Sequence, residues 1–147
     1  MPFLQGVKLY WTPKNAKMVS SQKWHMDGGD IRQLKLYLYL NDIDEGAGPL
    51  TIIPEKESRE LVKKYDYVKS KLPDVQVAAC VPREKWIQLT GTKGTLVVCD
   101  TSSWVHSGGR ARDGERLFLE FHYTTSAPYK IPDFPASDWK QRMVLAS

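Results

Sequence analysis

The stretch LKLYLYL, residues 34–40, alternates strictly between two kinds of side chain. On an extended chain its four leucines share one face, whereas Lys35, Tyr37 and Tyr39 share the other. The stretch RLFLEFHY, residues 116–123, alternates in the same way. A strand in an ordinary core is apolar inside and polar outside. Two strands that each pair an apolar face with a polar and aromatic one instead predict a cavity lined by the polar faces, with the apolar faces covered by something else.

Most of the remaining sequence is typical of short strands separated by turn-forming segments such as DGGD, DEGAGP and SGGRARDG. One helix is expected over Ser58–Lys71, where apolar residues recur at helical spacing. Many short strands and a single inserted helix predict an all-β-dominated jelly roll, built as one domain over residues 1–147. The expected strands are Phe3–Trp11, Lys17–His25, Gln33–Asn41, Pro49–Pro54, Val77–Val81, Trp86–Leu89, Thr95–Asp100, Trp104–His106 and Arg116–Thr124.

The composition argues against several classes of protein. No run approaches the roughly 18 apolar residues of a membrane helix, and the N-terminus shows no signal-peptide pattern. The net charge is +4, but Lys and Arg are scattered, which favours a solvated surface over a nucleic-acid interface. Cys80 and Cys99 both lie among apolar residues and are expected to be reduced core thiols, which favours a cytoplasmic protein.

The stretch SQKWHMDGGD, residues 21–30, holds one of the three histidines of the chain. His25 and Asp27 are one residue apart, so on an extended backbone their side chains project to the same side. Taken alone, the pair is more typical of a turn or cap than of a metal site. A third ligand would reverse that balance. His106 is the candidate, because it ends an apolar strand and precedes the glycine-rich SGGRARDG loop.

Two histidines and one carboxylate form the facial triad of non-haem Fe(II) oxygenases, which leaves positions open on the metal. Zinc hydrolases use a similar ligand set, so the triad alone leaves the chemistry open. Arg116 begins the strand after His106, on its polar face. There it is expected to point across the barrel and clamp a carboxylate; the alternative is a surface ion pair with Glu115 or Asp113. A metal and a distant arginine together indicate a pocket for a short dicarboxylic keto acid.

Four segments occur in an order and spacing typical of one family: SQKWHMD, LKLYLYLNDIDEGAGPLTIIP, GTLVVCDTSSWVHSGG and ERLFLEFHY. From about Phe3 to Thr124 the chain resembles the phytanoyl-CoA dioxygenase family of Fe(II)/2-oxoglutarate oxygenases. The resemblance implies a double-stranded β-helix, a cupin-like jelly roll of two antiparallel sheets. It also implies an enzyme that hydroxylates a small-molecule C–H bond while 2-oxoglutarate is converted to succinate and carbon dioxide.

The resemblance also implies roles for single residues. His25, Asp27 and His106 would bind iron. Arg116 would bind the far carboxylate of 2-oxoglutarate, and Tyr37 would lie beside this co-substrate. From its strand position alone, Tyr37 is equally compatible with ordinary packing.

The chain departs from the family pattern in three places. PEKES stands where members often carry PGSH, and Gly108 stands where a hydroxyl is often found. Only 24 residues precede His25, so the usual N-terminal helical segment is expected to be absent. The leucine faces of the two alternating strands would then be exposed. We therefore expect either a homodimer through that face or a fragment of a longer protein.

Two other functions stay open at this point. One is a cupin-type metal-binding or isomerase barrel, although cupins usually show His-x-His followed by a later glutamate. The other is a catalytically degenerate core that binds ligands without turning them over. The third histidine, His122, is expected to be structural, because the triad is complete without it.

Overall fold

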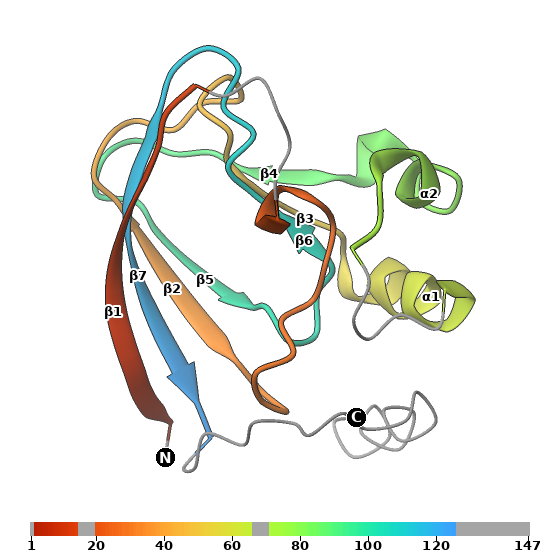
Figure 1. The fold of residues 1–147 in the computed structure, drawn as a ribbon. Helices are drawn as coiled ribbons and strands as arrows, with labels where there is room; N and C mark the ends of the chain where they lie inside the picture. The colour runs from red at the N-terminus through yellow and green to blue at the C-terminus, as the bar shows by residue number, and fades with distance from the viewer. Residues whose placement is uncertain (1, 15–19, 66–70, 126–147) are drawn as a thin grey trace.

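The computed structural model describes residues 2–14, 20–65 and 71–125. Its strands form two antiparallel sheets that face each other (Figure 1). In spatial order, the large sheet contains β1 (Phe3–Thr12), β7 (Arg116–Thr124), β2 (Leu34–Tyr39) and β5 (Leu96–Asp100). The small sheet contains β4 (Ile87–Leu89), β3 (Leu50–Ile52) and β6 (His106–Ser107). This is the double-stranded β-helix expected from the sequence.

The space between the sheets is filled by the alternating faces of their strands. Tyr39 of β2 is paired in register with Phe118 of β7, and Tyr37 meets the Phe118 ring edge-on at a centroid distance of 5.5 Å. The buried side chains here are Tyr37, Tyr39, Ile43, Ala47, Leu50, Ile52, Cys99 and Phe118. The polar and aromatic faces of β2 and β7 therefore point inward, as their alternation predicts.

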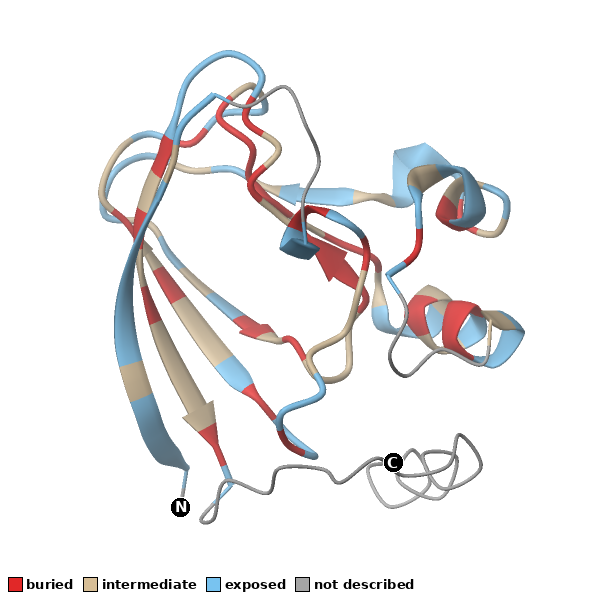
Figure 2. Ribbon diagram, viewed as in Figure 1, coloured by how far each residue is buried: buried red, intermediate tan, exposed pale blue. Residues whose placement is uncertain are grey.

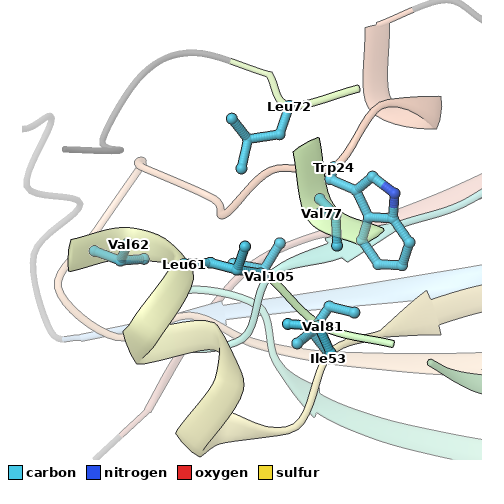
Figure 3. Close-up of a cluster of buried hydrophobic side chains, with 8 residues drawn as sticks. All are labelled: Trp24, Ile53, Leu61, Val62, Leu72, Val77, Val81 and Val105. Atoms are coloured by element: carbon cyan, nitrogen blue, oxygen red, sulfur yellow. The ribbon is translucent and has the colours of Figure 1, made fainter. Parts of the chain in front are cut away.

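Two helices, α1 (Glu55–Tyr65) and α2 (Asp74–Ala78), lie on the outer side of the small sheet (Figure 1). Their apolar residues pack onto a second buried cluster, drawn in Figure 3, of Trp24, Ile53, Leu61, Val62, Leu72, Val77, Val81 and Val105. Ser58 connects α1 to the end of β3 and the start of β6. Its hydroxyl donates to the carbonyl of Ile53 at 2.8 Å and accepts from the amide of Val105 at 3.0 Å.

The helical part of the sequence prediction needs correction. Helix α1 begins at Glu55, three residues before the expected Ser58, and the expected stretch 66–70 lies outside the described residues. The earlier start has a local cause: the Ser58 amide already donates to the Pro54 carbonyl, and acidic residues in the first turn suit the helix dipole. A second helix, α2, was not expected.

Two expected strands are wrong. Val77–Val81 falls on α2 and the turn after it, and Val77 and Val81 face the same buried cluster. A short apolar run can be read either as a strand or as a helix, and here packing against Trp24 decides. In the stretch Lys17–His25, residues 17–19 lie outside the described residues, Ser20–Gln22 forms the 3-10 helix η1, and Trp24 and His25 make isolated bridges.

The outer face of the large sheet is strongly apolar and largely open, as the exposed colouring along β1 shows in Figure 2. Leu9 and Trp11 of β1 are each 63 % exposed, and Leu96 and Val98 of β5 are more than half exposed. We call this surface the outer apolar face; its residues are Val7, Leu9, Trp11, Leu34, Leu36, Leu38, Leu96, Val98, Leu117, Leu119, Phe121 and Tyr123. Among the described residues, no helix has the length and apolarity needed to span a membrane.

Candidate metal centre

The backbone places His25 and His106 side by side. The His25 amide donates to the His106 carbonyl at 2.9 Å, and the His106 amide donates to the His25 carbonyl at 2.8 Å. Two residues further on, the Asp27 amide donates to the Thr101 carbonyl at 2.9 Å, at the end of β5. The segment that carries the His-x-Asp pair is therefore fixed to both β6 and β5 by main-chain bonds.

Local hydrogen bonds also orient both imidazoles. Nδ1 of His25 donates to the Lys23 carbonyl at 2.8 Å, and Nδ1 of His106 donates to the Trp104 carbonyl at 2.9 Å. Because a carbonyl only accepts, Nδ1 carries the proton in each neutral ring and Nε2 keeps a free lone pair. Metal-binding histidines are typically held by a hydrogen bond of this kind from the other ring nitrogen.

The three candidate ligands converge on one point. Nε2 of His25 lies 3.8 Å from Oδ1 of Asp27, and Nε2 of His106 lies 3.9 Å from Oδ2. One ligand atom from each residue falls within 4.8 Å of the other two. Ligands about 2.1 Å from one ion and at right angles lie about 3 Å apart, so the ligand atoms need to close by up to about 2 Å. Two imidazole nitrogens and a largely buried carboxylate form a donor set that fits a divalent cation, and Lys35 Nζ lies 2.6 Å from Oδ2 of that carboxylate.

The electrostatic surroundings keep these groups in the ionisation states that a metal requires. Burial lowers the pKa of His106 to about 4 and also lowers the pKa of His25, so both rings are neutral near pH 7. Burial alone would raise the pKa of Asp27. The charge of Lys35 and, in the acid range where Asp27 itself titrates, the charge of protonated His106 outweigh it, and the pKa of Asp27 falls to about 2. Two neutral imidazoles and one carboxylate therefore face the same space.

The pKa of His106 predicts how the metal-free protein responds to acid. Below pH 6.5 the unfolded chain takes up a proton at this residue, whereas the folded chain does so only near pH 4, so stability falls as the pH drops through that window. At pH 4.5 the loss is on the order of 2 kcal/mol, or roughly 5 °C in the unfolding midpoint. His106→Asn, which keeps a donor for the Trp104 carbonyl, should flatten this dependence in thermal scans between pH 7 and 4.5.

The matched control for that measurement is His122→Asn. The His122 ring is much less buried and should leave most of the slope in place. If His106→Asn kept the full slope, the acid sensitivity would have to arise from another group.

Arg116 lies at the start of β7 and is 9 % exposed. Its guanidinium carbon is 4.5 Å from the centre of the Phe118 ring, and its Nε is buried without a hydrogen-bond partner among the described residues. The expected alternative, a surface ion pair with Glu115 or Asp113, is not what forms: Glu115 accepts from the Trp11 indole, and Asp113 pairs with Lys14. Arg116 is thus a buried cation with unused donors.

The glycines after β6 let the backbone pass close to this guanidinium. A Cβ at Gly108 would lie 3.2 Å from Nη1 of Arg116, and one at Gly109 would lie 3.3 Å from Nη2. Gly109 also has a φ of +74°, which favours glycine. The missing hydroxyl at position 108 therefore coincides with close packing of the glycine against Arg116.

Tyr37 lies on the inner face of the large sheet, between the candidate metal ligands and Arg116. It is buried, and its register partner on β7 is Glu120. Burial raises the pKa of its phenol well above the ordinary value, so the group is a neutral donor or acceptor at all physiological pH values.

Sequence reasoning missed two charged residues of this wall. Lys35 Nζ lies 2.6 Å from Oδ2 of Asp27 and 3.8 Å from Oε2 of Glu120, and both the lysine and Glu120 side chains are largely buried. The alternation of β2 does place Lys35 on the inner face beside Tyr37. No pattern in the sequence brings it to Asp27, because Asp27 lies in the preceding loop. His122 lies outside the cluster and shares a 2.8 Å hydrogen bond with the side-chain amide of Gln33.

No protein-family model matches the sequence, and no curated protein matches it. Solved structures do resemble it. HygX from Streptomyces hygroscopicus, with nickel and 2-oxoglutarate bound, aligns at 14 % identity and a TM-score of 0.53, covering 85 % of this chain and 56 % of that one. EctD from S. alaskensis, with 2-oxoglutarate and 5-hydroxyectoine, aligns at 19 % identity and a TM-score of 0.54, covering 86 % and 45 %.

A third similar structure is SnoN, a non-haem alpha-ketoglutarate-dependent epimerase from nogalamycin biosynthesis, at 18 % identity and a TM-score of 0.50, covering 82 % of this chain and 46 % of that one. The chain spans about half the length of the solved structures it matches. At these identities the likeness concerns architecture. The chain therefore shares the fold of these three proteins.

Proposed function

We propose that this chain is the core of an Fe(II)- and 2-oxoglutarate-dependent dioxygenase that hydroxylates a small-molecule C–H bond and releases succinate and carbon dioxide. The main support for this proposal is that His25, Asp27 and His106 converge on one point. The wall of the same barrel also holds the buried Arg116, whose Nε has no hydrogen-bond partner among the described residues. Iron bound by the three residues would supply the redox chemistry with dioxygen. The similar fold of proteins solved with nickel or 2-oxoglutarate supports this assignment.

The protein residues have distinct tasks in this proposal. His25 and His106 would each offer Nε2 to the iron and Asp27 would offer one carboxylate oxygen, a ligand set that would leave room on the metal for the keto acid and dioxygen. Arg116 binds the far carboxylate of 2-oxoglutarate through its two parallel N–H donors. Tyr37 forms the wall between them and helps to exclude water from the inner space.

Three broader assignments rest on the same proposal. The order of the motifs around His25, His106 and Arg116 supports a member of the phytanoyl-CoA dioxygenase type. We take residues 1–147 as a single domain. Cys80 and Cys99 are both free thiols, which suits the reducing cytoplasm.

The experiment that tests the function measures succinate from the iron-loaded protein incubated with 2-oxoglutarate in air. We expect slow turnover without a primary substrate, and none above background for His25→Ala. A degenerate core would bind iron and 2-oxoglutarate but form no succinate. A cupin-type barrel would bind the metal without the keto acid. Equal succinate from wild type and His25→Ala would remove the oxygenase assignment.

The outer apolar face supports a proposal about assembly, with a second copy of this chain as its partner. Four strands spaced about 4.8 Å apart and up to about 30 Å long give a face of roughly 500 Å² in plan, and its accessible area is larger. Stable dimers bury about 800 Å² per partner, so a face-to-face pair of these sheets approaches that size. Monomers rarely leave so large an apolar patch uncovered.

We expect sedimentation velocity to show a concentration-dependent dimer that Leu119→Lys, at the centre of the face, dissociates. Val75→Lys is the matched control, because Val75 is a highly exposed apolar residue on α2, away from this sheet. A monodisperse monomer at about 100 μM, well above a micromolar dimer constant, would contradict the homodimer and leave the face to another segment or partner.

A further inference from the structure

The ion pair between Lys35 and Asp27 makes the two oxygens of the candidate ligand unequal. Without it they would be alike, because Oδ1 lies 3.8 Å from Nε2 of His25 and Oδ2 lies 3.9 Å from Nε2 of His106. Lys35 Nζ lies 2.6 Å from Oδ2. The ammonium therefore occupies one oxygen and leaves the other for a cation.

Lys35 is itself balanced by a second carboxylate. Its Nζ lies 3.8 Å from Oε2 of Glu120, whose side chain is only 8 % exposed. Lys35 and Glu120 thus form a formally neutral pair on the inner wall. A divalent ion bound to Asp27 would meet a nearby dipole rather than an isolated positive charge, so the ammonium can stay beside the ligand when the metal is bound.

We propose that Lys35 is a positioning residue that restricts Asp27 to one oxygen on the metal. The inference rests on the proposed function, since it concerns the same site. A carboxylate that bound through both oxygens would fill a fourth position on an octahedral ion. Only two would then remain, which is too few for a bidentate keto acid and dioxygen together. Lys35 keeps that fourth position free by holding Oδ2.

The competing explanation is that Lys35 merely neutralises Asp27 in the folded protein. A structural ion pair of that kind would affect stability and not the coordination of the metal. The two explanations therefore differ in what they predict for the loaded site, and spectroscopy of a bound Co²⁺ ion can separate them.

The test compares Lys35→Met and Lys35→Arg with wild type after loading with Co²⁺. Visible absorption and X-ray absorption report the coordination, and calorimetry reports the affinity of the Co²⁺ protein for 2-oxoglutarate. For Lys35→Met we expect an added carboxylate oxygen in the coordination shell and about tenfold weaker 2-oxoglutarate binding, within the range for residues that orient a ligand. Lys35→Arg, which retains a cation, should restore both signals.

Lys8→Met is the matched control. Lys8 lies opposite Glu120 in the register of β1 and β7 but is exposed, so its substitution removes the same charge without touching Asp27. It should match wild type in both measurements. If Lys35→Met does not fold, Lys35→Gln keeps one donor for Oδ2 and should give intermediate values.

Two results would overturn the proposal. An unchanged spectrum and unchanged 2-oxoglutarate affinity for Lys35→Met, with only a lower melting temperature, would make Lys35 a structural partner. Failure of wild type itself to bind Co²⁺ would remove the proposed function together with this inference. The two failures are distinguishable, because one appears in wild type and the other only in the comparison of variants.

Glu120→Gln probes the charge balance independently. With Glu120 neutral, the Lys35 charge is left without its second partner and opposes a divalent ion at Asp27, so Co²⁺ affinity should fall about tenfold. The double variant Lys35→Met/Glu120→Gln should regain most of that affinity. Additive losses in the double variant would contradict a coupled pair.

Discussion

Asp27→Ala is expected to abolish metal binding at the candidate centre and, with it, succinate formation. The substitution removes the only carboxylate of the cluster, and the remaining imidazoles of His25 and His106 bring no negative charge to the ion. Changes in residues that only orient a ligand cost up to about 100-fold in metal affinity, so loss of a ligand should exceed that figure. Calorimetric titration with Co²⁺ or Mn²⁺ measures the affinity, and succinate release measures the turnover.

His122→Ala is the matched control for this prediction. It removes the third histidine, which faces the same inner wall but is hydrogen-bonded to Gln33 and lies outside the cluster. We expect metal affinity within about threefold of wild type, an ordinary context effect. Loss of binding in His122→Ala together with full binding in Asp27→Ala would mean that the ion sits elsewhere.

Arg116→Met is expected to abolish 2-oxoglutarate binding while leaving the metal site intact. Truncating one partner of a buried, hydrogen-bonded charge pair costs about 2–5 kcal/mol, which corresponds to roughly a 30- to 4,000-fold weaker affinity. The affinity of the Co²⁺-loaded protein for 2-oxoglutarate, measured by calorimetry, should fall by such a factor. Affinity for Co²⁺ alone should not change.

The same substitution should not destabilise the metal-free protein. Arg116 is buried with no ion-pair partner among the described residues, and replacing such a charge with an apolar side chain of similar length is often neutral or stabilising. Its melting temperature should therefore equal or exceed that of wild type. Arg112→Met, at an exposed position in the loop before β7, is the control, and equal 2-oxoglutarate affinities for the two variants would exclude Arg116 as the carboxylate ligand.

The fold was predictable where the sequence shows a strict period. The alternation in residues 34–40 and 116–123 predicts both the strands and the direction of their side chains, and β2 and β7 confirm it. It was not predictable where a short apolar run stands alone. Val77–Val81 contains a β-branched residue at each end, yet its first residues lie in the five-residue helix α2, and both Val77 on the helix and Val81 after it are buried in the second core.

The candidate site also has a part that the sequence predicts and a part that it does not. The residues His25, Asp27 and His106 were identifiable because their types and order are unusual, and the structure brings them together. Lys35 was visible as an inward residue of β2, but its partner was not. Its contact with Asp27 depends on how the preceding loop folds back over the sheet, and local spacing carries no information about that distance.

The paired main-chain bonds between His25 and His106 have a consequence for the choice of metal. They fix the backbone of both histidines before any cation arrives, so only side chains need to adjust and the entropic cost of binding is small. Selection among divalent ions then depends on which ion suits the spacing that this fixed backbone allows, rather than on how far the backbone can adapt. Exchange of one such ion for another should leave the far-ultraviolet circular dichroism of the protein unaltered.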